Sequence, residues 1–564
     1  MTKDRHQVFW AASIAFVLTA FFGLQNFGAL LHGALLNPDS AMRLVRLDAM
    51  LQAHAPLHAV ARDGHGTVLH WSHLLDSVLL LMAWPFASFL GWHQGLVVIA
   101  PMVGPLSMAA LGASLAWAGA PVTAPQWRPL GALLACLSPA ILNYGLPGVV
   151  HHHVLIAAVA VMSAGHALRI VRGLGRASVH GAALGAWSGL GVWLTPESTP
   201  ICLMVIGLVW MCWLERPTAT MARALAAIGG AMFIVTGAAW LADPPAAGVL
   251  AAEQDRLSLV FVCLAAGLMM AGIAAARGLS RIASVVLAGV LAAAWIAAFP
   301  MVLGGTAGLL PADTSQVFLG DILEMRPVSS LSQAVATLAA AAVATIWLAV
   351  QSLRHRSWPG LYAVACSVAL MIAAALHIRF GTYPALFAAA VFPVAASTLA
   401  AAGPRLLVLL AALLLPRAGD LAAAASSAPP SAYRTCDLRG TASLLAPFAG
   451  RIVLAHVNDT PDLLWQTGIR TVGSLYHRSP DGFLRLRAAW QSEAGTVVPP
   501  AVRATGAGFV LVCPGAALPA FIAAAQTNSL AQTLGNGEVP PWLHRVGIAD
   551  PGGMVLYAVD EVSK

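Results

Sequence analysis

The sequence predicts an α-helical membrane protein that crosses the bilayer many times and ends in a small α/β domain. Of the 564 residues, 59% are hydrophobic and only 9% are charged, a balance typical of polytopic membrane proteins. The apolar runs are close to the roughly 20 residues that a helix needs to span a bilayer. The net charge of +7 does not indicate nucleic-acid binding, because the basic residues gather in short loops between apolar runs.

Thirteen spans are predicted, and an odd number places the two chain ends on opposite sides of the membrane. The arginine-rich loops near residues 169–176 and 277–281 belong in the cytoplasm, so the N-terminus is inside. We therefore expect a bacterial inner-membrane protein whose C-terminal domain is periplasmic. The predicted spans lie near residues 9–30, 95–118, 129–147, 153–169, 178–195, 199–215, 221–242, 257–276, 282–300, 331–352, 359–377, 383–401 and 404–418.

One further apolar run, residues 74–91, is predicted not to cross. As a span it would move the arginine loop at 169–176 outside, against the charge pattern. It is predicted instead to be a helix of the first external loop, 31–94, packed on the bundle or lying in the membrane interface. A second long external loop is expected at 301–330.

The membrane part is predicted to cover residues 1–420, followed by a linker rich in Ala, Ser and Pro at 421–435. Residues 436–564 mix short β-like runs with helical segments, which predicts a periplasmic α/β domain with its own core. This domain holds Cys436 and Cys513. In an oxidising compartment they could form a disulfide, and the alternative is two unrelated thiols.

Asp39 follows Pro38 at the start of a predicted helix just after the first span. Such an acid is either a helix cap favoured by the helix dipole, or a carboxylate that binds a divalent ion or polarises an acceptor. Arg43 and Arg46 follow one and two turns later, where they could pair with Asp39 or contact phosphate.

The run His151-His152-His153 begins a span on the same side of the membrane. Consecutive helical side chains point about 100° apart, so at most two of the three can face one site. Imidazoles at this place either bind a transition metal or phosphate, or are solvated side chains at the interface.

Glu324 and Arg379 are two further charged residues at the external membrane edge. Glu324 ends a long external loop, which makes it either a functional or a solvated acid. Arg379 lies between two spans, where a guanidinium is costly unless it meets an anion such as a lipid phosphate. Glu197 is a membrane-edge acid to which the sequence gives no clear role.

Other polar side chains of the external parts are candidates for substrate contact. His70 and His73 are spaced to share a helix face, so the first external loop could bind zinc or be shaped by hydrogen bonds. The candidate substrate-contacting residues are Arg43, Asp63, His70, Trp71, Asp76, Tyr476, His477 and Arg478.

The order of these features resembles the catalytic-subunit family of oligosaccharyltransferases, within the GT-C membrane glycosyltransferases, and most closely its bacterial relatives. Residues 37–39 match the first acidic motif of the family, and 322–324 match its loop glutamate. Residues 379–380 are similar to the motif whose arginine holds the lipid-linked pyrophosphate, and 64–76 look like part of the first external loop.

The resemblance implies transfer of a sugar or oligosaccharide from a polyprenyl-(pyro)phosphate donor to a periplasmic acceptor, which is a glycan, lipid or protein. It implies catalytic roles for Asp39 and Glu324. It also implies a divalent ion, Mg²⁺ or Mn²⁺, held by Asp39, His151, His153 and Glu324. Arg379 and His152 are expected to bind the donor phosphate. Besides this lipid-linked donor and acceptor, membrane lipids are the expected partners.

Two departures from the family separate this chain from the N-linking enzymes. Related sequences carry Asp-His-His where this chain has His151-His152-His153, so the usual metal site lacks an acid. The Trp-Trp-Asp sequence that recognises an Asn-x-Ser/Thr acceptor does not occur.

Three alternatives to this function remain at the sequence level. The first is a single-sugar transferase that uses a polyprenyl monophosphate to modify a lipid or polysaccharide. The second is a flippase or transporter of lipid-linked sugars, although no internal repeat is detectable. The third is a relative that binds glycolipid without turnover.

Overall fold

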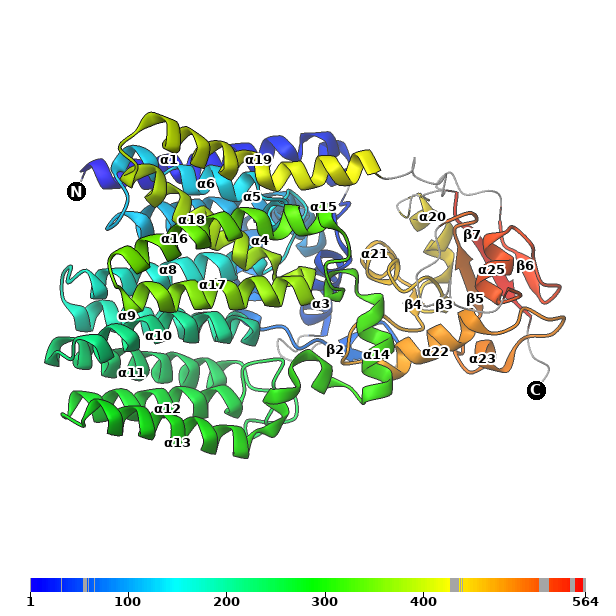
Figure 1. Cartoon of the computed structure of the whole chain (residues 1–564). Coiled ribbons are helices and arrows are strands. Elements are labelled where there is room, and N and C mark those ends of the chain that lie inside the picture. The colour runs from blue at the N-terminus through cyan, green and yellow to red at the C-terminus, as the bar shows by residue number, and fades with distance from the viewer. Residues whose placement is uncertain are drawn as a thin grey trace.

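The computed structural model describes residues 2–31, 33–53, 58, 60–64, 66–426, 436, 438, 440–516, 527–547 and 553–560. Long helices lie side by side in one bundle, and a smaller domain with a sheet lies beyond one end of it (Figure 1). We call this end of the bundle the domain side. The N-terminus lies at the opposite end (Figure 1).

The bundle helices follow the predicted spans closely. They are α1 (Thr2–Phe22), α2 (Phe27–Leu31), α5 (Trp92–Gly119), α6 (Leu130–Leu137), α7 (Pro139–Leu142), α8 (His153–Val171), α9 (Ala177–Leu194), α10 (Thr199–Glu215), α11 (Ala219–Ala242), α12 (Leu259–Ala276), α13 (Arg281–Ala298), α15 (Leu331–Ala334), α16 (Ala340–Arg354), α17 (Trp358–Leu376), α18 (Thr382–Thr398) and α19 (Ala402–Ser426). A π-helical stretch, Val335–Ala339, joins α15 to α16.

Nine of the thirteen predicted spans are helices long and apolar enough to cross a membrane among the described residues. The first span is a helix pair bent by 44° near Gly23. Three predicted spans fall short of that standard. The segment at 129–147 breaks at Pro139 into α6 and α7, α19 has a short apolar part (Gly403–Leu415), and α9 is rich in glycine.

The glycines of α9 explain why this helix is less apolar than its neighbours. Gly181 and Gly185 lie against the backbone of α11, where a Cβ at Gly185 would come within 2.1 Å of the Ile228 carbonyl oxygen. Small residues at four-residue spacing let two helix backbones approach closely, as in many membrane helix pairs. The close approach thus supplies the packing that large side chains supply elsewhere in the bundle.

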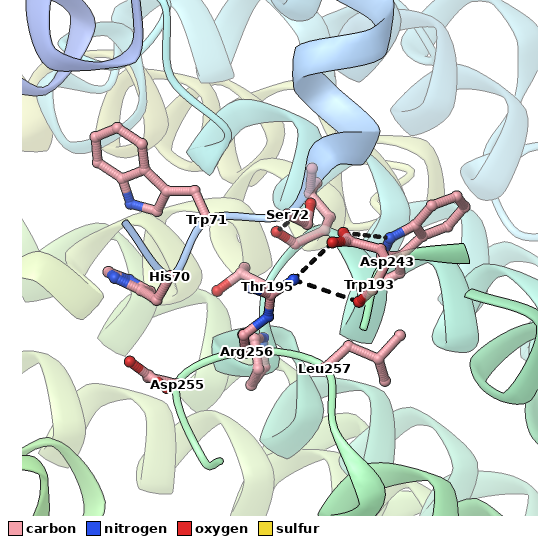
Figure 2. Close-up of a pocket in the computed structure, with 11 residues that line it drawn as sticks. His70, Trp71, Ser72, Trp193, Thr195, Asp243, Asp255, Arg256 and Leu257 are labelled. Carbon is pink, nitrogen blue, oxygen red and sulfur yellow. Dashed lines mark hydrogen bonds and ion pairs between the residues drawn. The ribbon is translucent and has the colours of Figure 1, made fainter. Parts of the chain in front are cut away.

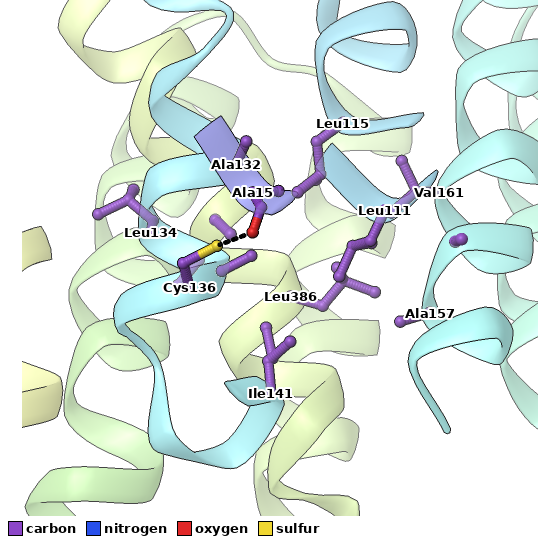
Figure 3. Close-up of a cluster of buried hydrophobic side chains, with 14 of the residues drawn as sticks. Ala15, Leu111, Leu115, Ala132, Leu134, Cys136, Ile141, Ala157, Val161 and Leu386 are labelled. Atoms are coloured by element: carbon purple, nitrogen blue, oxygen red, sulfur yellow. Dashed lines mark hydrogen bonds between the residues drawn. The ribbon is translucent and has the colours of Figure 1, made fainter. Parts of the chain in front are cut away.

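The centre of the bundle is filled by small and branched apolar side chains. Figure 3 shows Leu111 and Leu115 of α5 beside Ala157 of α8 and Leu386 of α18. Cys136 is fully buried there and lies 3.8 Å from the Ala15 carbonyl oxygen of α1, so it is a packing residue.

The helix α4 (His73–Leu90) is apolar and 18 residues long, yet both of its ends lie on the domain side. At its start, His73 contacts Asp243 after α11. Just past its end, His93 stacks on Trp465 of the smaller domain at 4.2 Å between ring centroids. By length and composition α4 could also cross a membrane, so its place in the first external loop stays a prediction.

The smaller domain contains a five-stranded mixed sheet in the order β4-β3-β5-β7-β6. β3 is parallel to β4 and β5, whereas β7 is antiparallel to β5 and β6. Its elements are α20 (Thr441–Leu445), β3 (Ile452–Leu454), α21 (Thr460–Gln466), β4 (Arg470–Thr471), α22 (Pro480–Gln491), α23 (Pro500–Arg503), β5 (Phe509–Val512), α25 (Leu530–Gly535), β6 (Leu543–Arg545) and β7 (Val555–Val559).

The domain boundaries differ from the predicted ones in two ways. The helix α19 continues to Ser426, so the predicted linker cannot begin at 421, and its remainder at 427–435 lies outside the described residues. The sheet is also extended by the first external loop, because Asp63 bridges Thr471 of β4. From the second external loop, Phe318 of α14 (Ala312–Asp321) packs on Phe483 in the domain core.

Cys436 and Cys513 form a disulfide across 77 residues of sequence, the first of the two predicted alternatives. Cys436 precedes α20 and Cys513 follows β5, so the bond closes most of the domain into one covalent loop. In the chain-entropy model a loop of this length stabilises the folded state by roughly 4 kcal/mol.

Replacing both cysteines by serine should therefore lower the free energy of unfolding of this domain by about 4 kcal/mol. Limited proteolysis of the full-length protein in increasing urea would show the shift. The matched control is Cys263→Ser, which removes a free thiol in the bundle and should leave the domain transition where it was. Equal midpoints for wild type and double variant would contradict a stabilising role of the bond.

Candidate functional site

The predicted acid Asp39 lies at the start of α3 (Pro38–Ala53) but does not cap this helix. Asn37 does so, because its Oδ1 accepts a hydrogen bond from the Ser40 backbone N–H at 2.8 Å. Ser40 Oγ in turn accepts a bond from the Val150 N–H at 2.8 Å, which ties α3 to the segment before α8. Asp39 is therefore free of the capping role and available for other contacts.

Asp39 contacts one side chain from the bundle and one from the smaller domain. His151 Nε2 lies 3.2 Å from its Oδ2, and the Tyr476 hydroxyl donates to its Oδ1 at 2.8 Å. The carboxylate keeps 37% of its side-chain surface exposed. Desolvation alone would raise the pKa of Asp39, but its bonds to His151 and Tyr476 and the nearby charge of Arg379 lower it well below its usual range. Asp39 is thus held as a carboxylate.

The three consecutive histidines are all buried and all offer a nitrogen to one place, so the prediction that at most two could face one site is wrong, because α8 begins only at His153 and helical spacing does not hold for the other two. His151 faces Asp39, whereas His152 Nδ1 lies 3.3 Å from Arg43 Nη2. His153 packs edge-on against the Tyr144 ring at 4.3 Å between centroids. Nitrogen atoms of all three rings lie within 4.8 Å of one another, which suits a metal ion. His151 Nδ1 and His153 Nε2 are buried without a hydrogen-bond partner.

Arg379, in the turn Ile378–Gly381 before α18, lies between two glutamates. Its Nη1 donates to Glu324 at 2.9 Å, and its Nη2 donates to both oxygens of Glu197 at 2.7 and 3.0 Å. Its Nε is buried without a partner. With three of its five N–H groups bonded to the glutamates, the guanidinium keeps its Nε–H and one Nη1–H for a ligand. It lines a cavity together with His153, Glu197, Phe380, Thr382 and Tyr383.

Tyr144, to which the sequence drew no attention, connects the two halves of the site. Its hydroxyl donates to Glu324 at 2.7 Å, and its ring lies between Glu324 and the histidine run. Glu197, whose role the sequence left open, belongs to the site through Arg379. An aromatic residue inside an apolar run carries no sequence signal of such a role.

Two of the candidate substrate-contacting residues are instead buried in a network of charges. Arg43 Nη1 pairs with Asp76 at 2.8 Å, with 2% and 1% of the two side chains exposed. Arg46 pairs with the other oxygen of Asp76 at 3.2 Å and contacts His73 at 2.9 Å. Because a substrate cannot reach these groups, we correct their expected role to one of positioning the site.

The network continues through His73 to Asp243, which the sequence analysis missed. His73 Nδ1 lies 2.7 Å from Asp243 Oδ1, and Arg256 donates to the same oxygen at 2.6 Å. Figure 2 shows Asp243 between Arg256 and Trp193 beside a second pocket. This pocket is lined by His70, Trp71, Ser72, Trp193, Leu194, Thr195, Pro196, Asp243, Asp255, Arg256 and Leu257.

The remaining candidates lie where the first external loop meets the smaller domain. Trp71 packs edge-on against Tyr476 at 5.6 Å, and His70 lies 4.5 Å from the His477 ring. Arg478 binds Asp255 and Glu253. Asp63 is fully buried and bonds to Thr67 and Ser474, so it holds the loop on the domain and cannot contact substrate.

The fold has counterparts of known structure. An oligosaccharyltransferase, AglB of the archaeon Archaeoglobus fulgidus, solved with an inhibitory peptide and a dolichol-phosphate, matches with a TM-score of 0.65 and 13% identity over 98% of this chain and 74% of that one. The same enzyme solved with Zn and sulfate matches with a TM-score of 0.63, at 13% identity over 98% and 73% of the two chains. Tethered to an acceptor peptide with the NVT sequon, it matches at 0.62 and 14% identity over 90% and 69%.

No protein-family model matches the sequence, and neither does any curated protein. The predicted resemblance is confirmed for the fold, because the match extends over both the bundle and the smaller domain. The chain is thus a multi-pass membrane protein with the oligosaccharyltransferase-like GT-C fold.

The substitution Asp76→Asn should destabilise the whole domain side, because it removes the carboxylate that forms ion pairs with both buried arginines, Arg43 and Arg46. Breaking a buried ion pair from one side typically costs roughly 3–5 kcal/mol. After heating, the monodisperse fraction of the detergent-solubilised variant would fall at a lower temperature than that of the wild-type protein. Asp4→Asn, which breaks an exposed pair with Arg128, is the control and should change little. Equal behaviour of both variants would rule out the network as a stabilising element.

Proposed function

We propose that the protein transfers a sugar or oligosaccharide from a polyprenyl-(pyro)phosphate donor to an acceptor on the domain side of the membrane. The observation that carries the proposal is the linkage of Arg379, which lines a cavity with His153, to Glu324 and, through Tyr144, to His151 and Asp39. The shared fold supports it, since a solved structure with this fold contains a dolichol-phosphate and another an acceptor peptide. Periplasmic placement of the domain follows from the arginine loops.

The charge of the site supports a cation as part of the active form. Asp39, Glu197 and Glu324 contribute three carboxylates against the single guanidinium of Arg379, which leaves a net charge of −2 among these four side chains. A phosphate would be repelled by such a group of residues. One divalent ion would neutralise it and would leave the guanidinium of Arg379 available to the donor.

The ligands fit a divalent ion that accepts imidazole. Asp39 with His151 and His153 would hold it, since the carboxylate is partly exposed and two ring nitrogens lack partners. Imidazole suits Zn²⁺ and related ions, whereas Mg²⁺ and Mn²⁺ prefer oxygen ligands, so we propose Zn²⁺ in place of the Mg²⁺ or Mn²⁺ that the resemblance implied. Glu324 is engaged by Tyr144 and Arg379 and would act on the acceptor or as an outer partner.

The chemistry breaks the bond between the anomeric carbon and the phosphate oxygen and forms a bond from that carbon to the acceptor. The phosphate is already a good leaving group, so positioning and charge stabilisation should dominate. Arg379 would bind the departing phosphate through its Nε and through the N–H groups that the glutamates release. Asp39 would accept a hydrogen bond from the attacking group of the acceptor. The bound ion would supply positive charge beside the developing negative charge.

Asp39→Asn and Arg379→Lys should each lower the rate of glycan transfer at least about 100-fold while the protein still folds. Asparagine removes the charge of the carboxylate, and lysine loses the fork that binds phosphate. Transfer would be followed with the lipid-linked glycans of the source cells and mass spectrometry of the products. Asp48→Asn changes an acid on the same helix that bonds only to Gln52, and it should retain full activity. Full activity of both site variants would refute the assignment.

Chelation should abolish transfer, and Zn²⁺ should restore it better than Mg²⁺ or Mn²⁺ does. His151→Asp would replace an imidazole by a carboxylate and should shift the preference towards Mg²⁺ and Mn²⁺. The measurement is the initial rate of transfer at a fixed donor concentration with each ion in turn. Activity that persists after exhaustive chelation would exclude an essential metal.

A further inference from the structure

A second group of metal-binding side chains lies outside the proposed active site. His70 of the first external loop, Asp255 of the loop after α11 and His477 of the smaller domain each offer a ligand atom, and these atoms lie within 4.8 Å of one another. His477 Nε2 is 2.7 Å from Asp255 Oδ2, and the two imidazole rings are 4.5 Å apart. Figure 2 shows His70 and Asp255 side by side at the edge of the second pocket.

Hydrogen bonding alone does not account for this arrangement. His70 Nδ1 is buried and has no hydrogen-bond partner, although an unpaired buried polar atom is costly. A buried imidazole nitrogen without a hydrogen-bond partner is available to a metal ion.

We propose that His70, Asp255 and His477 form a Zn²⁺ site that joins three segments of the chain. Two imidazoles and one carboxylate are a common ligand set for zinc, and a water molecule would complete four-fold coordination. With bonds of about 2.0–2.1 Å, two ligands of a tetrahedral zinc ion lie about 3.3 Å apart. The contact between His477 and Asp255 would therefore have to widen by only about 0.6 Å.

Arg478 holds Asp255 in a fixed orientation. Its Nε donates to Asp255 Oδ2 at 2.7 Å and its Nη2 to Asp255 Oδ1 at 2.5 Å, and Nη2 also donates to Glu253 at 2.6 Å. A hydrogen-bond partner of a metal-binding carboxylate fixes the orientation of that carboxylate. Arg478 would have this role for Asp255.

A metal ion at this second site would affect the proposed active site through Tyr476. His477 follows Tyr476, whose hydroxyl donates to Asp39. His70 precedes Trp71, which packs on Tyr476 and lies 4.5 Å from the guanidinium of Arg43. A metal that fixes His70 to His477 would thus hold Tyr476 in place.

The test is the number of Zn²⁺ ions bound by the chelator-treated, full-length protein, measured by equilibrium dialysis and elemental analysis. With the proposed active-site ion, wild type should bind two ions. His70→Ala and Asp255→Asn should each bind one, with the affinity at the second site reduced at least about tenfold. The double variant His151→Ala/His153→Ala should also bind one ion. The triple variant that adds His70→Ala should bind none. Asp255→Asn keeps the shape of the carboxylate should His70→Ala fold poorly.

The control is His544→Ala, which removes a histidine from an exposed His–Asp pair of the same domain and should leave two ions bound. If the second site binds Zn²⁺ but the proposed active site does not, wild type binds one ion and His70→Ala binds none. Failure of the proposed active-site metal can therefore be told apart from failure of the second site. Unchanged stoichiometry and affinity in both His70→Ala and Asp255→Asn would overturn the inference.

Discussion

The architecture of the domain side depends on keeping a chain of buried charges paired. Asp76 compensates Arg43 and Arg46, and Asp243 compensates His73 and Arg256. These groups come from α3, α4 and the two ends of the loop after α11, which are far apart in sequence. A buried charge without its partner is costly, so these segments are stable only when they are assembled together. The same assembly sets Arg43 against His152 and thereby orients the histidine run beside Asp39.

The smaller domain takes part in the same constraint, which explains why its boundaries could not be drawn by composition alone. Asp63 of the first external loop extends the sheet beside Thr471, and Arg62 donates to the Thr467 and Ile469 carbonyl oxygens of the domain. From the domain, Tyr476 reaches back to Asp39. Asp39 therefore has one contact from the bundle and one from the domain.

Sequence order was sufficient to single out Asp39, Glu324 and Arg379 as candidates, because charged residues at the edge of an apolar span are rare and costly. It could not find Tyr144 or Asp243, whose roles arise only from tertiary contacts. The α6–α7 break and the glycine face of α9 likewise show that apolar length predicts a crossing segment but not its helical continuity. Asp63 and Asp76 looked like substrate residues because sequence does not reveal burial.

The histidine at position 151 is best understood through the charge of the site. An aspartate at position 151 would make the net charge of these side chains more negative, −3 in place of −2. One divalent ion would then leave an excess negative charge facing the donor phosphate. With His151 the same ion brings the group to neutrality, and two glutamates no longer need Arg379 as their sole counter-charge. Replacement of the acid by imidazole is therefore compatible with donor binding, provided that the ion is one that imidazole binds well.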